Sequence, residues 1–220
     1  MSLDIELNKW VVMLVPLILS VTCHEVAHGY VAYKMGDMTA KLAGRLTLNP
    51  IYHLDIVGSI ILPLLLKLSG SPFIFGYAKP VPVNPYNFHN FKKGTIYVSA
   101  AGVTANFILA VLSAIILHIF IYFEKSWATT LLKPIIMDLL YMLINSIIIN
   151  SVLAVFNLIP IPPLDGSRIL AIFLPDKIRE SFNSIERFGL IIIMILLATD
   201  SLNKVINFFA TPLIDFLLGK

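Results

Sequence analysis

Three stretches of this chain, residues 9–33, 95–123 and 134–158, are apolar over most of their length. A helix needs about 20 mostly apolar residues to cross the hydrocarbon core of a bilayer. Hydrophobic residues make up 58% of the 220 residues and charged residues only 13%, whereas about a quarter of the residues of a soluble domain are charged. We therefore predict an all-α polytopic membrane protein, in which residues 1–220 form one helix bundle of about four to six spans.

The remaining apolar segments are shorter. Residues 56–66 contain Gly58 and Pro63 and are too few to span, so we expect a re-entrant or tilted half-helix there. Residues 188–199 and 202–218 are predicted to supply one or two further spans, which leaves the number of spans near the C-terminal end open.

The polar segments have a different pattern. Residues 41–48 are predicted to form a short strand. Residues 73–91 are rich in proline and asparagine, which excludes a helix and predicts loop and extended chain. Within them Pro80, Val81 and Pro82 lie on an extended stretch that could receive a substrate strand by β-addition, or serve only as a connector.

Charge and cysteine content exclude several classes of function. The formal net charge is +3 and the cations are scattered, so nucleic acid is not expected as a partner. The lipid bilayer is the expected surrounding. Cys23 is the single cysteine, which excludes an intrachain disulfide and a cysteine-rich metal site, and we interpret it as a small packing residue.

Residues 24–28 read His-Glu-Val-Ala-His and lie inside the first apolar stretch. On a helix His24 and His28 are one turn apart, so both imidazoles can reach one metal ion. This is the H-E-x-x-H pattern of zinc hydrolases, in which the histidines bind Zn²⁺ and the glutamate, here Glu25, acts as general base on a metal-bound water.

A hydrolytic zinc ion usually takes three protein ligands and leaves one position for water. Asp165 is the best candidate for the third ligand, because it follows a span directly in a proline-rich loop. A solvated turn aspartate is the competing interpretation, since Asp-Gly is a common turn pair. The other candidates for the third ligand are Asp55, His53, His89 and His118. For His89 and His118 we expect a structural role instead.

The order of the spans tests Asp165 as a ligand. A group of basic residues follows the first span and few precede it, which places its C-terminal end on the cytoplasmic side. If residues 56–66 do not cross, residues 95–123 run outwards and residues 134–158 run back inwards. Asp165 then arrives on the same side of the membrane as His28.

A second motif follows the third long stretch. Residues 157–166 read Asn-Leu-Ile-Pro-Ile-Pro-Pro-Leu-Asp-Gly. Together with residues 24–28 they resemble the paired signature of the site-2 protease family of intramembrane zinc metalloproteases. Residues 44–50 and 78–85 resemble the compact bacterial and archaeal branch, which has no PDZ domain.

The resemblance implies roles for five residues. His24, His28 and Asp165 would hold one Zn²⁺ per chain, and Glu25 would be the general base. Asn157 would contact the substrate near the metal; from the residues alone, a hydrogen bond between helices is the commoner role for such an asparagine.

We therefore predict a zinc-dependent intramembrane endopeptidase. Its expected substrates are single-pass or few-pass membrane proteins, and its expected location is a prokaryotic cytoplasmic membrane with the active site towards the cytoplasm. A membrane zinc carrier is one alternative, although it would favour more ionisable groups along the spans. A catalytically silent protein that binds helices is the other, although Glu25 argues against it. The sequence leaves the oligomeric state open.

Overall fold

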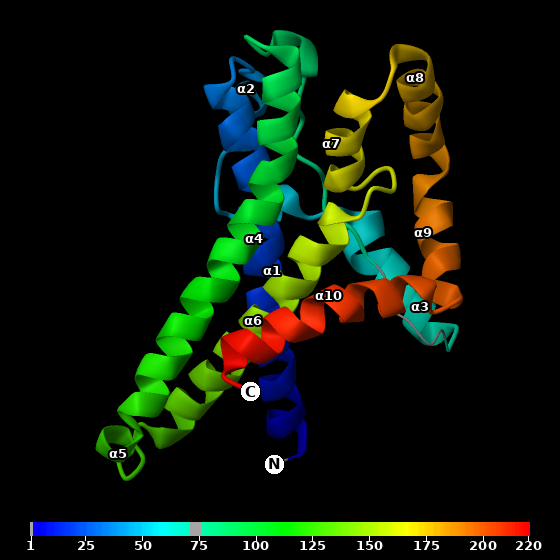
Figure 1. The fold of residues 1–220 in the computed structure, drawn as a ribbon. Coiled ribbons are helices and arrows are strands. Elements are labelled where there is room, and N and C mark those ends of the chain that lie inside the picture. Colours follow the sequence, from blue (N-terminus) through cyan, green and yellow to red (C-terminus); the bar gives the residue numbers. More distant parts are fainter. Residues whose placement is uncertain (1, 71–75) are drawn as a thin grey trace.

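The structure is a computed structural model that describes residues 2–70 and 76–220, and its regular elements are helices (Figure 1). In chain order they are α1 (Ser2–Lys34), α2 (Thr39–Leu42), η1 (Pro50–His53), η2 (Ile56–Ile61), α3 (Leu62–Leu68), η3 (Pro85–Asn87), α4 (Phe91–Tyr122), α5 (Glu124–Trp127), α6 (Lys133–Leu158), α7 (Asp165–Phe173), α8 (Asp176–Ser184), η4 (Ile185–Phe188), α9 (Gly189–Ala198) and α10 (Ser201–Leu218). The predicted all-α class is confirmed.

Four helical segments of the described chain are long and apolar enough to cross a membrane. They are Val11–Lys34 of α1, α4, α6 and the continuous segment Asp176–Ala198. The last joins α8, η4 and α9, so one candidate span follows residue 176. Between α9 and α10 the chain turns at Asp200, which has the left-handed φ of 59°. Figure 1 shows α10 lying crosswise to α9 and over α6.

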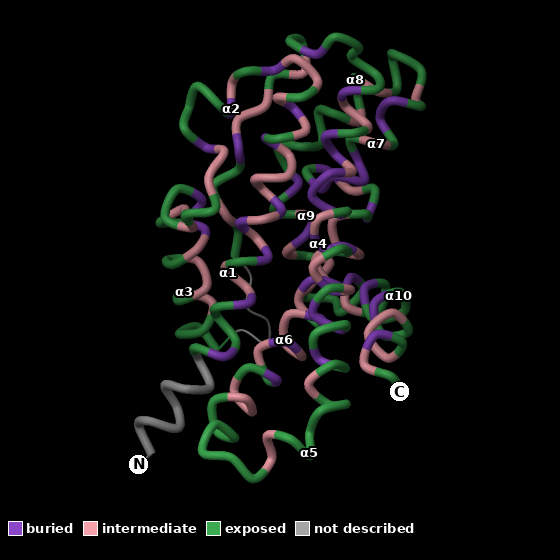
Figure 2. The backbone as a smooth tube through the Cα atoms, turned by 90° about the vertical axis from the view of Figure 1, so that its left-hand side faces the viewer, coloured by how far each residue is buried: buried purple, intermediate pink, exposed green. Residues whose placement is uncertain are grey.

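The core of the bundle is formed by α1, α4 and α6, which pack along one another (Figure 1). Figure 2 shows that burial is concentrated in the body of the bundle, while the turn at α5 is exposed. Ala110, Ala114 and Ile147 are almost fully buried where α4 meets α6. The small side chains of the two alanines allow the helix backbones to approach closely. Many large apolar side chains on the outer faces are exposed, as a lipid-facing surface requires.

The segment Ile56–Leu68 is apolar but shorter than the candidate spans, and most of its large side chains are exposed. It comprises a π-helix, η2, followed by α3, and is too short to span. The chain afterwards returns beside its starting point, since the backbone N–H of Lys79 donates to the carbonyl of His53 and that of Tyr77 donates to Gly58. This return fits the predicted re-entrant element; its path through a membrane and the order of spans that depends on it stay predictions.

The predicted strand at residues 41–48 is wrong. Its first residues end α2, and Gly44 then takes a left-handed φ of 66°. The N–H of Arg45 bonds back to the carbonyl of Ala40, which closes a turn. Residues 76–84 form no helix, as predicted, and no strand is assigned in any residue that the structure describes. The prediction that proline and asparagine exclude a helix up to residue 91 is wrong at Pro85–Asn87, which form the short 3-10 helix η3 with Pro85 in its first turn. Residues 73–75 of the predicted loop lie outside the described residues.

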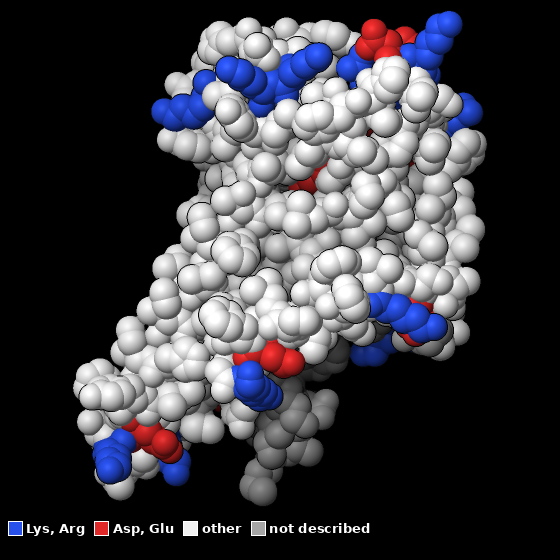
Figure 3. Space-filling model, in the orientation of Figure 1, with Lys and Arg blue, Asp and Glu red and all other residues white. Residues whose placement is uncertain are grey.

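On the face seen in Figure 3, charged side chains lie mainly towards the upper and lower edges of the molecule, and few Lys, Arg, Asp or Glu side chains lie between them. Lys and Arg are dense at the end that carries α2, α7 and α8, opposite the end that carries α5 and the N-terminus. This distribution fits a chain that is embedded in a bilayer along the length of α1, α4 and α6.

Candidate metal centre

His24 and His28 face one another on adjacent turns of α1. Their Nε2 atoms are 3.0 Å apart and their rings meet edge to face. His24 is buried. The spacing of four residues, which predicted that both rings share one side of the helix, therefore gives two nitrogen atoms aimed at a common point.

Asp165 is the first residue of α7 and brings its carboxylate to that point. Its Oδ2 atom lies 3.3 Å from Nε2 of His24 and 3.2 Å from Nε2 of His28. The neighbouring Gly166 permits this placement, because a Cβ atom there would lie 2.1 Å from the carbonyl oxygen of Leu158. The loop after α6 can thus fold back closely enough to present Asp165 to α1.

The three ligand atoms fit a zinc ion. Tetrahedral Zn²⁺ with bonds of about 2.0–2.1 Å places neighbouring ligand atoms about 3.3 Å apart, close to the distances observed among His24, His28 and Asp165. Oδ2 of Asp165 is buried and has no hydrogen-bond partner, as expected of an atom whose partner is a cation. Among the described residues these three form the group of His, Cys, Asp and Glu that can hold a metal.

The far sides of both imidazoles are hydrogen-bonded. Nδ1 of His28 lies 2.7 Å from the carbonyl oxygen of Val98, and Nδ1 of His24 lies 2.6 Å from Oδ1 of Asn106. A carbonyl oxygen can only accept, so Nδ1 of His28 carries a hydrogen and its Nε2 is free to bind metal. Such outer partners fix the tautomer and the ring orientation of metal-binding histidines.

Gly102 provides the space beside the two rings. A Cβ atom at this position would lie 2.5 Å from Nε2 of His28 and 2.6 Å from Nε2 of His24. Val98, Gly102 and Asn106 follow one another at intervals of four residues, so they share the face of α4 that lies against the histidines of α1. One face of α4 therefore orients both rings and leaves room at their metal-facing atoms.

Glu25 is fixed by a distant segment. Its Oε2 accepts a hydrogen bond of 2.7 Å from the backbone N–H of Val81. The carboxylate has capacity for further hydrogen bonds. The site therefore combines a convergent ligand set with an adjacent carboxylate that is held in place.

Comparison with known proteins identifies the family of this chain. The model of peptidase family M50, the site-2 protease family, matches residues 12–198. This chain belongs to that family. The matched range contains the predicted ligands, the predicted base and Asn157, and the chain is accordingly a metalloprotease and an integral membrane protein.

Several curated proteins are similar to this M50 chain. "Putative zinc metalloprotease YwhC" of Bacillus subtilis is 40% identical over 187 residues, which cover 85% of this chain and 80% of that protein. "Putative zinc metalloprotease Rip2" of Mycolicibacterium smegmatis is 28% identical over 85% of this chain and 66% of that protein. The protein of the same name from Mycobacterium tuberculosis is 29% identical over 88% of this chain and 69% of that protein. No solved structure matches significantly.

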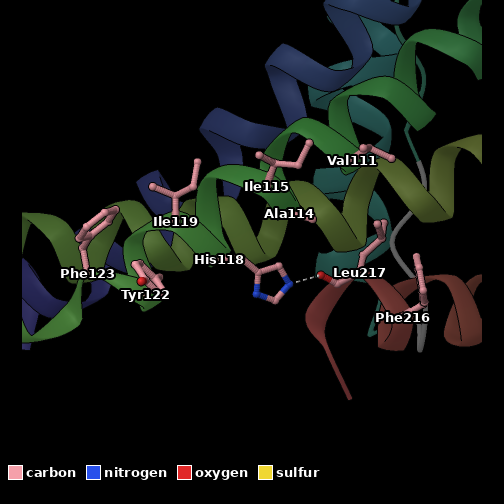
Figure 4. A pocket seen from close by; sticks show the side chains of 9 residues that line it. All are labelled: Val111, Ala114, Ile115, His118, Ile119, Tyr122, Phe123, Phe216 and Leu217. Atoms are coloured by element: carbon pink, nitrogen blue, oxygen red, sulfur yellow. Dashed lines mark hydrogen bonds between the residues drawn. The ribbon is translucent and has the colours of Figure 1, made fainter.

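Within this M50 chain, the other candidates for a third ligand have structural partners. Oδ1 of Asp55 accepts from the N–H of Gly58 and caps η2. His53 is buried, with Nε2 bonded to the carbonyl of Thr47. His118 bonds to the carbonyl of Leu217 in an apolar groove of about 590 Å³ between α4 and the end of α10 (Figure 4). His89 is exposed, and its backbone N–H donates to the carbonyl oxygen of Met35. None of them joins the group of three.

Asn157 lies near the C-terminal end of α6, and Cys23 lies on α1 directly before His24. The amide of Asn157 donates to the carbonyl of Leu153 in its own helix, so its contact with substrate stays a prediction. Cys23 is half-buried on α1, consistent with its interpretation as a packing residue.

Sequence reasoning missed Asn106 and Gly102. The available signal was their spacing, because Gly102 and Asn106 lie one helical turn apart in a span and could face α1 together. That spacing alone does not show which helix this face of the span contacts.

Proposed function

We propose that this metalloprotease is an intramembrane zinc endopeptidase, which hydrolyses peptide bonds within or near the transmembrane segments of single-pass or few-pass membrane proteins. The observation that supports this best is the convergence of His24, His28 and Asp165 inside a bundle of candidate spans, beside Glu25. A site among candidate spans suits a substrate that itself lies in the membrane.

His24, His28 and Asp165 would hold one zinc ion. When bound, zinc supplies Lewis-acid polarisation of a carbonyl oxygen and lowers the pKa of a water molecule to about 7. The chain's own contribution to the reaction is then proton transfer. Glu25 takes the proton of the attacking water and delivers it to the amine that leaves when the peptide C–N bond breaks.

The hydrogen bond from Val81 supports this role for Glu25. It uses one carboxylate oxygen and restricts the rotamers of the side chain, so the base is positioned before the substrate arrives. A pre-positioned group lowers the entropic part of the barrier to reaction.

The extended segment around Pro80 is proposed to bind the substrate backbone. In an extended chain the N–H and C=O groups of successive residues point to alternate edges. The N–H groups of Tyr77, Lys79 and Val81 all bond to the protein, so the other edge belongs to the residues between them. Pro80 and Pro82 on that edge lack an N–H and offer only carbonyl acceptors.

A substrate strand would thus bind this edge through its own N–H groups. The N–H groups in a transmembrane helix are already bonded internally, so the substrate must unwind near the scissile bond. Val81 was predicted to contact substrate as well, but its side chain is buried and its N–H bonds to Glu25. The proposed contact therefore rests on Pro80 and Pro82.

We also propose a prokaryotic cytoplasmic membrane as the location, with the site towards the cytoplasm. The end of the bundle that carries α2, α7 and α8 is rich in Lys and Arg (Figure 3), and basic loops favour the cytoplasmic side. The C-terminal turn of α1 lies at that end (Figure 1). His28 comes only six residues before the last residue of this helix, Lys34.

The decisive experiment combines metal content with cleavage. Purified protein in detergent is incubated with single-pass transmembrane peptides that contain helix-breaking residues, and the products are analysed by mass spectrometry. We expect about one zinc per chain and cuts inside the apolar segment. Glu25→Gln should retain zinc and lose cleavage by a factor of about 10² or more. An active Glu25→Gln enzyme, or cuts confined to soluble loops, would overturn the proposal.

A further inference from the structure

A buried chain of hydrogen bonds leads from His24 through α4 into α6. Oδ1 of Asn106 meets Nδ1 of His24, and the amide nitrogen of Asn106 donates to Oδ1 of Asn150 over 2.8 Å. The amide nitrogen of Asn150 in turn donates to the carbonyl and to the hydroxyl of Ser146. Both asparagines have an exposed fraction of 0%, so bulk water does not reach their amide groups.

The direction of this chain is fixed at both backbone ends. The amide nitrogen of Asn106 also donates to the carbonyl oxygen of Ser20, over 3.3 Å. Rotating the Asn106 amide by half a turn would place its oxygen against the carbonyl of Ser20 and against Oδ1 of Asn150. Rotating Asn150 as well would place its oxygen against the carbonyl of Ser146. Backbone carbonyls cannot donate, so each rotation creates a buried pair of acceptors.

The fixed direction determines which nitrogen of His24 is protonated. Because Oδ1 of Asn106 must face His24, Nδ1 of the ring has to carry the hydrogen, and Nε2 is left with a free lone pair. A neutral histidine in water prefers the opposite tautomer, with its hydrogen on Nε2, and in that tautomer the nitrogen that faces the metal position here has no free lone pair. Without Asn106 the ring would have to change tautomer before it could act as a ligand.

We propose that Asn106 is a positioning residue for the metal site, and that Asn150 and Ser146 on α6 hold it in the orientation that selects the metal-binding tautomer of His24. The inference rests on the proposed zinc site. The helix α6 then affects the metal site in two ways. Its side chains Asn150 and Ser146 hold Asn106, and the loop that follows it carries Asp165. The relative placement of α1 and α6 is thereby coupled to two of the three ligands.

The test measures zinc affinity by competition with a chelator, without any substrate. We expect Asn106→Leu to weaken zinc binding by about 10- to 100-fold, the usual effect of losing an outer partner of a ligand. Asn150→Leu should weaken it less, since Oδ1 of Asn106 still faces His24. The matched control is Asn145→Leu, because Asn145 lies on α6 but bonds only to the carbonyl of Tyr141 among the contacts described; its affinity should equal that of the parent.

A second readout follows the tautomer itself. The chain has five histidines, so ¹⁵N-histidine labelling gives a short list of ring signals, and His24→Gln identifies that of His24. In the zinc-free parent we expect the hydrogen of His24 on Nδ1, and in Asn106→Leu a shift of population towards Nε2. If Asn106 only packed the helices and did not orient His24, the tautomer populations of His24 would be the same in Asn106→Leu and in the parent.

The outcomes separate this proposal from the proposed function. If the parent binds zinc and folded Asn106→Leu binds it equally tightly, the positioning role is overturned and the zinc site stands. If the parent binds no zinc, the proposed function fails, while the tautomer of His24 still tests the role of Asn106. Should Asn106→Leu not fold, the parent spectrum decides, and a hydrogen on Nε2 of His24 in the zinc-free protein overturns the proposal.

Discussion

The backbone N–H of Val81 donates a hydrogen bond of 2.7 Å to Oε2 of Glu25, although the two residues are 56 positions apart. Val81 is buried, and Gly29 one turn beyond Glu25 makes room for it, since a Cβ atom on Gly29 would lie 2.8 Å from Cγ1 of Val81. The extended segment is therefore docked on the helix that carries the histidines, and the base depends on that docking.

We expect Val81→Pro to lower kcat for transmembrane peptides by about 10- to 100-fold, the cost of a hydrogen bond to a charged group. Proline removes the N–H but suits the extended backbone that Pro80 already imposes nearby. Zinc content should not change. Val81→Ala is the control, because it shortens the side chain and keeps the N–H; equal losses in both variants would show that packing, and not the hydrogen bond, matters.

The ligand set predicts which variants lose zinc. Asp165→Ala and His28→Ala should fall from about one zinc per chain to near none after dialysis, because a hydrolytic zinc ion needs three protein ligands. Asp55→Asn is the matched control. It removes a rival carboxylate yet keeps an oxygen that can cap η2 at Gly58. Loss of zinc from the Asp55 variant together with its retention in Asp165→Ala would refute the assignment.

A methyl group at Gly102 should close the metal position. In Gly102→Ala the new Cβ atom would lie 2.5 Å from Nε2 of His28 and 2.6 Å from Nε2 of His24. These are the two nitrogen atoms that must bind the ion. We expect zinc affinity to fall by about 10-fold or more, as the rings are pushed out of their placement. Thr104→Ala on the exposed side of α4 serves as control. Unchanged affinity in Gly102→Ala would mean that α4 can shift without disturbing the ligands.

The parts of the fold that follow from local sequence were predictable. The spans are recognised by length and apolar composition, and the shared face of His24 and His28 follows from helical periodicity. Asp165 could be placed because the order of spans fixes the side on which each loop emerges. These inferences need no knowledge of which helices touch.

The parts that depend on helix contacts could not be predicted. Asn106, Asn145 and Asn157 all look alike in the sequence, yet the last two bond to their own helices and Asn106 bonds to a candidate ligand. The bond between Val81 and Glu25 joins segments that only the fold brings together. The strand predicted at residues 41–48 failed because Gly44 takes a left-handed conformation and closes a turn there.

Asp37 gives a prediction about acid stability. Its buried carboxylate accepts hydrogen bonds from Thr39, from the backbone N–H of Asn84 and from the amide of Asn87, and so ties the end of α1 to the chain before α4. Burial raises the pKa of Asp37, but these hydrogen bonds outweigh it and lower the pKa below the ordinary value of 3.8. The ionised form is thus favoured in the folded protein.

A lowered pKa in the folded state means that Asp37 contributes stability above pH 3.8, and that this contribution is lost as the pH falls from there through the folded pKa. Asp37→Asn introduces an NH₂ group among donors, so we expect it to cost about 1–3 kcal/mol at pH 7. Melting in detergent, recorded from pH 7 to pH 3, should show the parent approaching the variant at the acid end. Parallel curves would mean that the carboxylate charge does not stabilise this junction.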